Sequence, residues 1–322
     1  MIARARSASL AIDPVQLEGI HHISAITGDA AGNVEFYTGV LGMRMVKRTV
    51  NQDEPNVYHL FYGDEAGSPG MDLTFFEYPG AARGVAGAGM VHRIVWRVGS
   101  PASLDFWRER LAAHGVEAVA TGDSVLFADP EGLEHELVVD GSGDEKLSAH
   151  SPEIPAEHAL LGFDGVRAYS NDPPRSQSLL EGALGFTRRG GETWEVRGER
   201  RGSIYAYDPA PPEINRRQGA GTVHHVAFAS KLDEIELWRS QVAAAGARPT
   251  PLIERFYFKS VYFLEPSGVL FEIASIGPGF AIDEDPAHLG ERLSLPAPFE
   301  PMREQLERTL RELPYPPAWR AA

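Results

Sequence analysis

The chain repeats one pattern four times, and this repetition constrains the fold more than any other feature of the sequence. Each copy opens with a run rich in valine, isoleucine and aromatic residues, which is typical of a β-strand. The four runs are GIHHISAIT from Gly19, GMVHRIVWRV from Gly89, FDGVRAYS from Phe163 and GTVHHVAFAS from Gly221. The sequence therefore predicts four units of similar architecture.

A helix is expected after each opening strand, because apolar residues then recur at i, i+3 and i+7. This spacing is found in Val34, Tyr37 and Leu41, in Leu104, Trp107 and Leu111, and in Ile235, Trp238 and Val242. Leu180 and Leu184 keep part of it in the third unit. The glycines that would end the four helices as left-handed C-caps are Gly42, Gly115, Gly185 and Gly246. Further strand-like runs complete each unit.

The turns Asp129–Gly132 and Glu265–Gly268 place the second and fourth units in register, because Glu136 and Glu272 each lie six residues after the proline of their turn. The polar stretch 139–158 is expected to link two halves of two units each, 17–145 and 158–276. The Pro-rich tail, 277–322, is expected to contain one helix, Phe299 to Leu313, and to wrap the body or form an oligomer contact.

The composition excludes several kinds of protein. Among the 322 residues, 45 are Asp or Glu and 30 are Lys or Arg, so the net charge of −15 argues against binding nucleic acid or an anionic membrane. The absence of cysteine removes disulfides, iron–sulfur clusters and thiolate chemistry, so any metal must be held by His and carboxylates. The first sixteen residues do not resemble a signal peptide, and no apolar segment is long enough for a membrane helix. We therefore expect a cytoplasmic protein.

Two of the opening strands carry a histidine pair, His21-His22 and His224-His225. Glu272 lies within an apolar run, where a carboxylate is costly unless it is paired or binds a metal. Neighbouring strand residues point to opposite faces, so only one histidine of each pair can share a cavity with Glu272. We expect His22 and His225 to do so, because each follows an inward apolar residue by two positions. Two imidazoles and a carboxylate form the facial triad of non-haem Fe(II) oxygenases.

The alternative is that these histidines are ordinary hydrogen-bonded core residues. The recurrence of the pair at the same place in two units, with an inward Glu in one of them, favours a metal site. The second unit has Arg93 where the fourth has His225, opposite a retained Glu136, and the third unit offers only Arg167 or Ala168. We interpret Arg93 and Glu136 as a salt bridge that fills a former metal site.

With these residues the chain resembles the vicinal oxygen chelate superfamily of glyoxalases and extradiol dioxygenases, over residues 17–276. The runs IHHISAITG, NVYHLFYGDEAGSPG and ERFYFKSVYFLEPSGVLFEIAS and the tail motif IGPGFAIDE are similar to its hydroquinone-cleaving dioxygenases. The resemblance implies an α+β fold, the glyoxalase/bleomycin-resistance/extradiol dioxygenase fold, in which four βαβββ modules pair into two cupped, incomplete-barrel domains.

The resemblance also implies site residues and chemistry. It maps the metal ligands onto His22, His225 and Glu272 and further active-site residues onto His21, His224, Arg255 and Tyr262, with Ser24 where the group has Thr. It implies Fe2+, with Mn2+ as an alternative, and an aromatic 1,4-diol and O2 as substrates. His21 or His224 would take the hydroxyl proton, and Arg255 and Tyr262 would contact the remote hydroxyl or the oxygen.

Three other functions are open at this point. The first is a catechol extradiol dioxygenase. In the superfamily that the chain resembles, such enzymes take their metal ligands from the third and fourth units, but the third unit here has no histidine. A glyoxalase-like isomerase needs a fourth ligand, for which Glu77 is the candidate, although we expect it to be exposed at the end of its strand. A protein that only sequesters an aromatic compound or a metal would not need open coordination positions.

Overall fold

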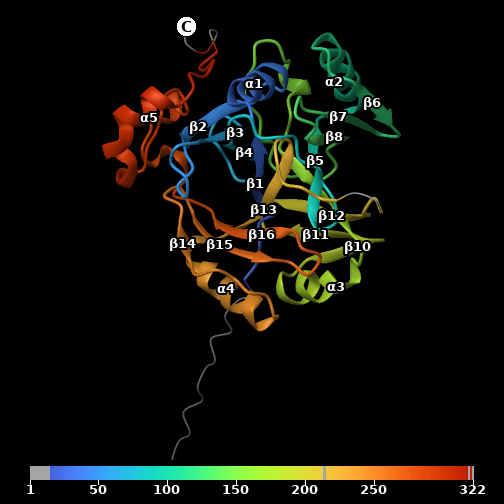
Figure 1. Cartoon of the computed structure of the whole chain (residues 1–322). Helices are drawn as coiled ribbons and strands as arrows, with labels where there is room; N and C mark the ends of the chain where they lie inside the picture. The colour runs from blue at the N-terminus through green and yellow to red at the C-terminus, as the bar shows by residue number, and fades with distance from the viewer. Residues whose placement is uncertain (1–14, 213–214, 318–319, 321–322) are drawn as a thin grey trace, which may run out of the picture.

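Two curved eight-stranded sheets make up the body of the protein (Figure 1). The structure is a computed structural model that describes residues 15–212, 215–317 and 320. The first sheet has the order β14 (Ile253–Glu254), β15 (Lys259–Leu264), β16 (Leu270–Ser275), β13 (Thr222–Ser230), β1 (Ile20–Thr27), β4 (Asp72–Glu77), β3 (Tyr58–Gly63) and β2 (Arg44–Val50). The second has the order β10 (Thr187–Gly190), β11 (Thr193–Arg197), β12 (Gly202–Pro209), β9 (Phe163–Ser170), β5 (Met90–Val98), β8 (Glu134–Val139), β7 (Ser124–Ala128) and β6 (Ala118–Thr121).

The four repeats pair in a nested order, the first with the fourth and the second with the third. Each opening strand is parallel to the last strand of its own repeat and antiparallel to the opening strand of its partner, so β1 lies beside β13 and β5 beside β9. The expected halves, 17–145 and 158–276, therefore do not each form one sheet. The opening strand of every repeat has one edge left to satisfy, and the partner's opening strand supplies its backbone hydrogen bonds.

Each repeat contains the expected helix. The helices are α1 (Ala30–Val34), α2 (Pro101–Ala113), α3 (Pro174–Gln177) and α4 (Ile235–Ala244). Both α1 and α3 continue as π-helical segments, Glu35–Val40 and Ser178–Ala183. The predicted apolar faces are confirmed, since Tyr37, Trp107, Leu180 and Trp238 are all buried. The predicted C-cap glycines all have positive φ, from 68° at Gly42 to 92° at Gly246.

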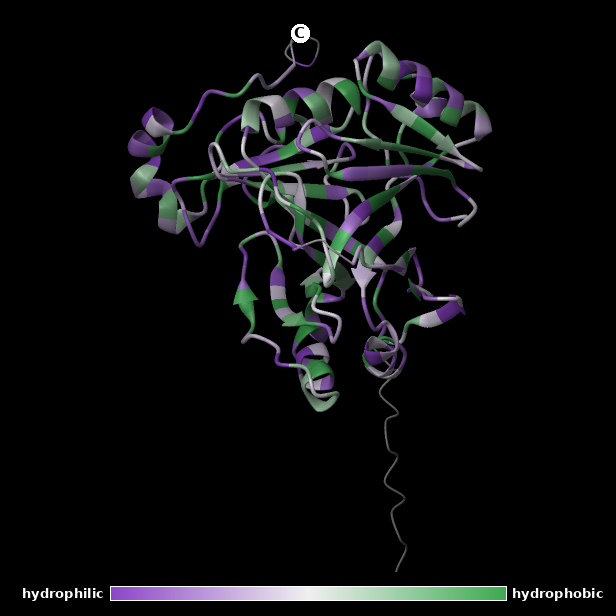
Figure 2. Cartoon of the chain, turned by 45° about the vertical axis from the view of Figure 1, so that its right-hand side comes forward, coloured by the Kyte–Doolittle hydropathy of each residue, from purple (hydrophilic) through white to green (hydrophobic). Residues whose placement is uncertain are grey.

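The helices lie on the outside of the strands. Figure 1 shows α1 and α2 together at one end of the molecule and α3 and α4 at the other, with the sheets between them. In Figure 2 the helices carry hydrophilic and hydrophobic stretches side by side, as expected of elements with one buried face. This arrangement leaves the concave side of each sheet available for a cavity.

The tail wraps the outer edge of the first sheet. It pairs with β2 through the bridge between Arg48 and Leu293, and the Tyr315 hydroxyl donates a hydrogen bond to the carbonyl of Met45. Lys47, on β2, is completely buried, and its ammonium group contacts Asp283, at 2.7 Å, and Glu284 of the tail. The tail thus acts as the expected wrap within one chain.

The expected tail helix, Phe299 to Leu313, is shorter than predicted. A 3-10 turn spans Ala297–Met302 and α5 spans only Arg303–Thr309, because Pro301 cannot continue an α-helical hydrogen-bond pattern and Leu310 is already extended. No helix in the described ranges is long and apolar enough to cross a membrane. The expectation about the N-terminal segment concerns mainly residues 1–14, which lie outside the described residues.

Candidate metal centre and substrate cavity

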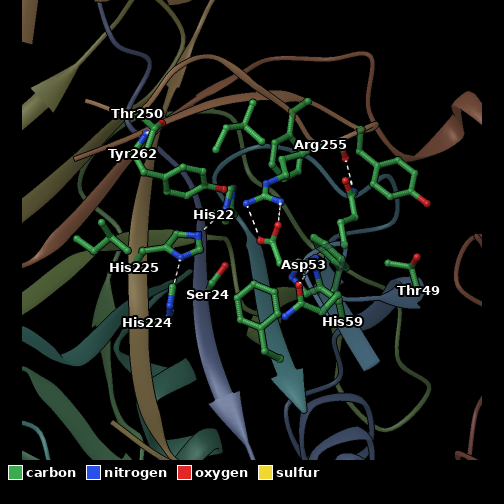
Figure 3. Close-up of a pocket in the computed structure, with 18 of the residues that line it drawn as sticks. His22, Ser24, Thr49, Asp53, His59, His224, His225, Thr250, Arg255 and Tyr262 are labelled. Carbon is green, nitrogen blue, oxygen red and sulfur yellow. Dashed lines mark hydrogen bonds and ion pairs between the residues drawn. The ribbon is translucent and has the colours of Figure 1, made fainter. Parts of the chain in front are cut away.

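The three predicted ligands meet where β1, β13 and β16 run side by side. Glu272 Oε2 lies 3.2 Å from His22 Nε2 and 2.9 Å from His225 Nε2, and the two imidazole nitrogens are 3.2 Å apart. All three side chains are buried, Glu272 completely. Figure 3 shows the two histidines next to one another on the wall of a cavity. The structure thus brings together residues that are 250 positions apart in the sequence (272 − 22).

The geometry of this cluster fits a divalent metal. Ligand atoms about 2.1 Å from a metal and at right angles to each other are about 3 Å apart, which matches the three separations in the cluster. Glu272 Oε2 is buried and receives no hydrogen bond, while Oε1 accepts one from the Ser260 hydroxyl at 2.5 Å. An orphaned carboxylate oxygen between two imidazole nitrogens is costly unless a cation completes the site. The two imidazoles hold the pKa of Glu272 well below its usual range, although burial alone would raise it.

Two β-bulges explain how the two histidines of each pair contact one another. In the pairing of β1 with β13, His21 is an extra residue on β1 and His224 an extra residue on β13. A bulge changes the direction of its side chain, so strict alternation fails at these two positions. His21 Nδ1 lies 3.0 Å from His22 Nδ1, and His224 Nδ1 lies 2.8 Å from the Nδ1 of His225.

These contacts set the tautomers of the ligand histidines. His21 Nε2 donates to the carbonyl of Ser275 at 3.2 Å, which leaves its Nδ1 to accept a hydrogen bond from His22 Nδ1–H. His22 then presents a free electron pair on Nε2, as metal binding requires. Burial, reinforced by His22, lowers the pKa of His21 to about 3, so its ring is neutral at pH 7. His21 lies behind His22 and does not line the cavity, so its contact is with His22 and not with the cavity.

His224 differs from His21 because it lines the cavity. Burial and the neighbouring His225 lower the pKa of His224 to about 4, so it is neutral. When its Nδ1 accepts from His225, its Nε2 carries the proton and can donate to an oxygen in the cavity. The structure therefore supports a hydrogen-bond donor at this position more directly than the expected base.

Arg255 and Tyr262 lie together beside the triad. Tyr262 is directly across from Glu272 in the pairing of β15 with β16, and its ring packs edge-on against His225 at 5.5 Å between centroids. The Arg255 guanidinium lies 5.6 Å from the centre of the Tyr262 ring and forms an ion pair with Asp53 at 3.0 Å. Burial and the charge of Glu272 raise the pKa of Tyr262 far above its usual range, so its hydroxyl remains a donor. This geometry is consistent with the expectation that Arg255 and Tyr262 lie at the site.

The cavity that these residues line has a volume of about 360 Å³. This is the lower part of the range for small-molecule sites, and the aromatic walls suit a planar ring. Its lining includes the two ligand histidines together with His224, Arg255, Tyr262, Ser24, His59, Phe76 and Phe258. Sequence reasoning missed His59 and Ser260. The available signal was their alternation, since Ser260 precedes Tyr262 by two residues on one face of a strand and His59 precedes Phe61 in the same way.

Glu77, the candidate fourth ligand, lies on the other face of the first sheet. It is buried rather than exposed, which corrects our expectation, because Glu77 Oε1 accepts a hydrogen bond at 3.2 Å from the backbone of Ala30, at the start of α1. The cavity face of β4 is formed instead by Thr74 and Phe76, which alternate with Glu77. The described residues thus place three ligands at the site, and Glu77 is not among them.

The second sheet contains the salt bridge that the sequence suggested at the position equivalent to the triad. Arg93 Nη1 lies 3.2 Å from Glu136, as expected, and Nη2 lies 3.1 Å from Glu134. The pairing of β5 with β9 repeats the two bulges of the first sheet, and their positions place Gly165, not Arg167 or Ala168, at the equivalent of His22. A Cβ atom at Gly165 would lie 2.0 Å from the carbonyl oxygen of Ile204, so this position has no room for a ligand.

Comparisons with known proteins agree with the fold and the site. A family model described as the Glyoxalase/Bleomycin resistance protein/Dioxygenase superfamily matches residues 19–137 and 162–273. The Bacillus subtilis protein named "Putative ring-cleaving dioxygenase MhqO" is 41% identical over 299 residues, which cover 91% of this chain and 95% of that protein. The chlorohydroquinone/hydroquinone 1,2-dioxygenase of Sphingobium indicum is 31% identical over 315 residues, which cover 93% of this chain and 98% of that protein.

A solved structure gives the same result in three dimensions. The crystal structure of a "putative dioxygenase" from Bacillus subtilis superimposes with a TM-score of 0.85 at 38% identity, and the match covers 93% of this chain and 98% of that one. The predicted α+β fold of four βαβββ modules is confirmed. The chain belongs to the glyoxalase/bleomycin resistance protein/dioxygenase superfamily.

Proposed function

We propose that the protein is an Fe(II)-dependent dioxygenase that opens the ring of a 1,4-dihydroxy aromatic compound with O2. The observation that carries this proposal is the cluster of His22, His225 and Glu272 in the wall of an aromatic-lined cavity. A two-histidine, one-carboxylate triad is the ligand set of non-haem Fe(II) oxygenases and leaves cis positions for substrate and oxygen. The Sphingobium relative is a chlorohydroquinone/hydroquinone 1,2-dioxygenase by name, which supports the choice of a 1,4-diol.

The residues present also agree with the chemistry that such a metal would supply. Bound Fe(II) would provide the electronic link between a spin-paired aromatic ring and O2. The same ligand set accepts Mn2+ as an alternative. His21 and Ser260 hold the ligand atoms in place, the first through His22 and the second through Glu272. Removal of such an outer contact commonly lowers metal affinity or activity by about ten- to a hundredfold.

The surrounding donors act on the oxygen atoms of the substrates. The Arg255 guanidinium and the protonated Tyr262 hydroxyl lie beside the triad, where they stabilise negative charge that develops on oxygen. His224 lines the same cavity, and in its neutral form its Nε2–H donates a hydrogen bond to an oxygen atom there. The Phe76 and Phe258 rings exclude water from the ring-opening reaction.

A four-ligand isomerase is less compatible with the site. Such an enzyme needs a second carboxylate at the metal, but Thr74 takes the corresponding position on the cavity face of β4. Its hydroxyl bonds to the Ser24 hydroxyl at 2.8 Å. A neutral hydroxyl tied up in this way is a poor replacement for a carboxylate.

The experiment is an oxygen-electrode assay on protein purified without oxygen and loaded with Fe(II). We expect O2 consumption with hydroquinone, and incorporation of both atoms of 18O2 into a ring-opened product seen by mass spectrometry. Parallel samples would contain catechol and, without O2, a hemithioacetal. Cleavage of catechol alone would replace the proposal by an extradiol mechanism, and oxygen-independent turnover of the hemithioacetal would replace it by isomerase activity.

A further inference from the structure

His59 lines the same cavity as the triad and is packed tightly between two aromatic rings. It lies on β3, and its ring is clamped between Phe61 and Phe76, with centroids 4.0 and 4.2 Å away. The Phe76 ring in turn lies 6.4 Å from the ring of His225, so one aromatic ring separates His59 from this ligand histidine. A ring fixed in this way can offer a nitrogen atom in a constant direction.

A hydrogen-bonded chain connects His59 with the metal side of the cavity. His59 Nε2 lies 3.0 Å from Thr74 Oγ1, which in turn lies 2.8 Å from Ser24 Oγ. Ser24 is on the cavity wall two residues after His22. The other ring nitrogen, Nδ1, has no hydrogen-bond partner within the described part of the chain, and the residue lines the cavity. The chain therefore fixes one nitrogen and leaves the second for a ligand.

The charge state of His59 makes that second nitrogen useful. Burial, together with His22 and His225, lowers the pKa of His59 well below its usual value, so the ring is neutral. When Thr74 donates to Ser24, His59 Nε2–H donates to Thr74 and Nδ1 becomes an acceptor. In this direction Thr74 accepts from His59 and donates to Ser24, and His59 Nδ1 and the Ser24 proton are left for groups in the cavity.

Beside the triad, the cavity wall presents donors. Arg255 has only donors, Tyr262 remains protonated, and His224 presents Nε2–H. These three groups suit oxygen atoms that carry negative charge near the metal. A hydroxyl of the substrate that does not bind the metal keeps its proton and needs an acceptor, which the unused nitrogen of His59 provides.

Given the proposed function, we propose that His59 Nδ1 accepts a hydrogen bond from the hydroxyl of the 1,4-diol that lies across the ring from the metal. Thr74 and Ser24 are positioning residues, since they act through the orientation of the His59 ring. The contact would select substrates whose second oxygen is para to the first and carries a proton. Tyr262 and Arg255 would then act on the oxygen on the metal side, since Tyr262 lies directly across from Glu272 and Arg255 lies beside the Tyr262 ring.

The test is a calorimetric titration, without oxygen, of Fe(II)-loaded protein with hydroquinone and with phenol, which lacks the remote hydroxyl. In His59→Phe the clamp between the two phenyl rings is kept and the acceptor is lost. We expect about tenfold weaker binding of hydroquinone and unchanged binding of phenol. His59→Gln, which keeps an acceptor oxygen, should recover part of the difference. Thr74→Val should lose part of it, and Thr74→Ser should behave as the wild type.

His92→Phe is the matched control, because His92 is the bulged histidine of the second sheet, paired with Asp208 at 2.9 Å and outside the cavity. It should bind both ligands as the wild type does. An equal loss for both ligands in His59→Phe, or none, would overturn the role of His59 while leaving the proposed function intact. If the wild type binds hydroquinone no better than phenol, the inference fails as well. A wild type that binds hydroquinone but consumes no O2 contradicts the proposed function alone.

Discussion

Thr74 occupies on β4 the position that Glu272 occupies on β16. Thr74 is paired with Ser24, two residues after His22, and Glu272 is paired with Ala227, two residues after His225. The internal symmetry of the first sheet therefore offers four ligand positions around one point. The chain fills three of them with metal ligands and the fourth with a hydroxyl, and this difference separates an open coordination site from a closed one.

Replacing that hydroxyl by a carboxylate should close the site. In Thr74→Glu we expect the affinity for Fe(II) or Zn(II) to rise by about tenfold or more, because a fourth anionic ligand is added, and O2 consumption to be lost. Metal affinity would be measured by competition with a chelating dye. Thr74→Gln has the same size without the charge and serves as the control. Equal metal affinity in the two variants would show that residue 74 cannot reach the metal.

The triad itself is tested by removal of each ligand. His22→Ala, His225→Ala and Glu272→Ala should each bind less than stoichiometric iron and lose activity, while circular dichroism stays unchanged. Elemental analysis after gel filtration measures the iron content. Arg93→Ala, in the second sheet, should keep its iron and lose only stability. Wild-type iron in any one of the three ligand variants, or its loss in Arg93→Ala, would assign the metal to a different place.

Much of this site was accessible from the sequence because the fold is repetitive. The helical spacing around Trp107 and Trp238 predicted two buried helix faces, and both tryptophans are buried. The same repetition identified His22, His225 and Glu272, since a ligand at one place in two units is an unlikely accident of composition. The structure brings their ligand atoms within 3.2 Å of each other.

The parts that the sequence did not predict depend on contacts between strands. Alternation placed His21 on the opposite face from His22, but a bulge brings their rings into contact. The nested pairing of the repeats is a choice among equivalent strand edges, which no single repeat encodes. Glu77 was expected to be exposed, but it is buried, and its carboxylate accepts a hydrogen bond from the backbone of Ala30 at the start of α1. Each of these outcomes requires the position of a second element.

Glu77 should contribute to stability and not to metal binding. Its carboxylate accepts a hydrogen bond from the backbone of Ala30, and burial raises the pKa of the group, so the hydrogen bond rather than the charge is what stabilises the fold. Glu77→Gln keeps an acceptor oxygen and should change the free energy of unfolding by less than about 1 kcal/mol. Iron content and ring cleavage should stay as in the wild type. Urea unfolding monitored by tryptophan fluorescence gives the first quantity. Loss of metal in this variant would support a four-ligand centre instead.

Asp144 should make the stability depend on pH in the acid range. It lies in the linker and accepts hydrogen bonds at 2.7 Å from both Arg97 and Arg197. Burial alone would raise its pKa, but hydrogen bonds from Arg197 and Arg97 lower it from 3.8 to about 2. A depressed carboxyl pKa stabilises the folded state fully above the unfolded pKa, and this contribution is lost as the pH falls through the folded pKa.

We therefore expect Asp144→Asn to be less stable than the wild type by about 1–2 kcal/mol at pH 7. The difference should fall to about half at pH 3 and continue to shrink at lower pH. Urea midpoints across this range give the measurement, and Asp105→Asn, which removes an exposed carboxylate on α2, is the control. A difference that is constant from pH 7 to pH 3 would mean that the ion pairs do not carry the effect.

Tyr262 should matter for turnover and not for metal binding. A catechol has two adjacent hydroxyls that can chelate two cis positions of a metal, whereas a hydroquinone can offer only one. The protein must then stabilise the oxygen at the metal, and the Tyr262 hydroxyl, next to Glu272 and His225, is placed to do so. Loss of one oriented donor to a developing charge costs a few kcal/mol in the transition state, or about a hundredfold in rate. We expect Tyr262→Phe to lower kcat for hydroquinone by this order with iron still bound, whereas Phe263→Leu, on the opposite face of β15, should change stability alone. If the wild type cleaves catechol much faster than any hydroquinone, or if Tyr262→Phe turns over normally, chelation by the substrate rather than donation by the protein controls the reaction.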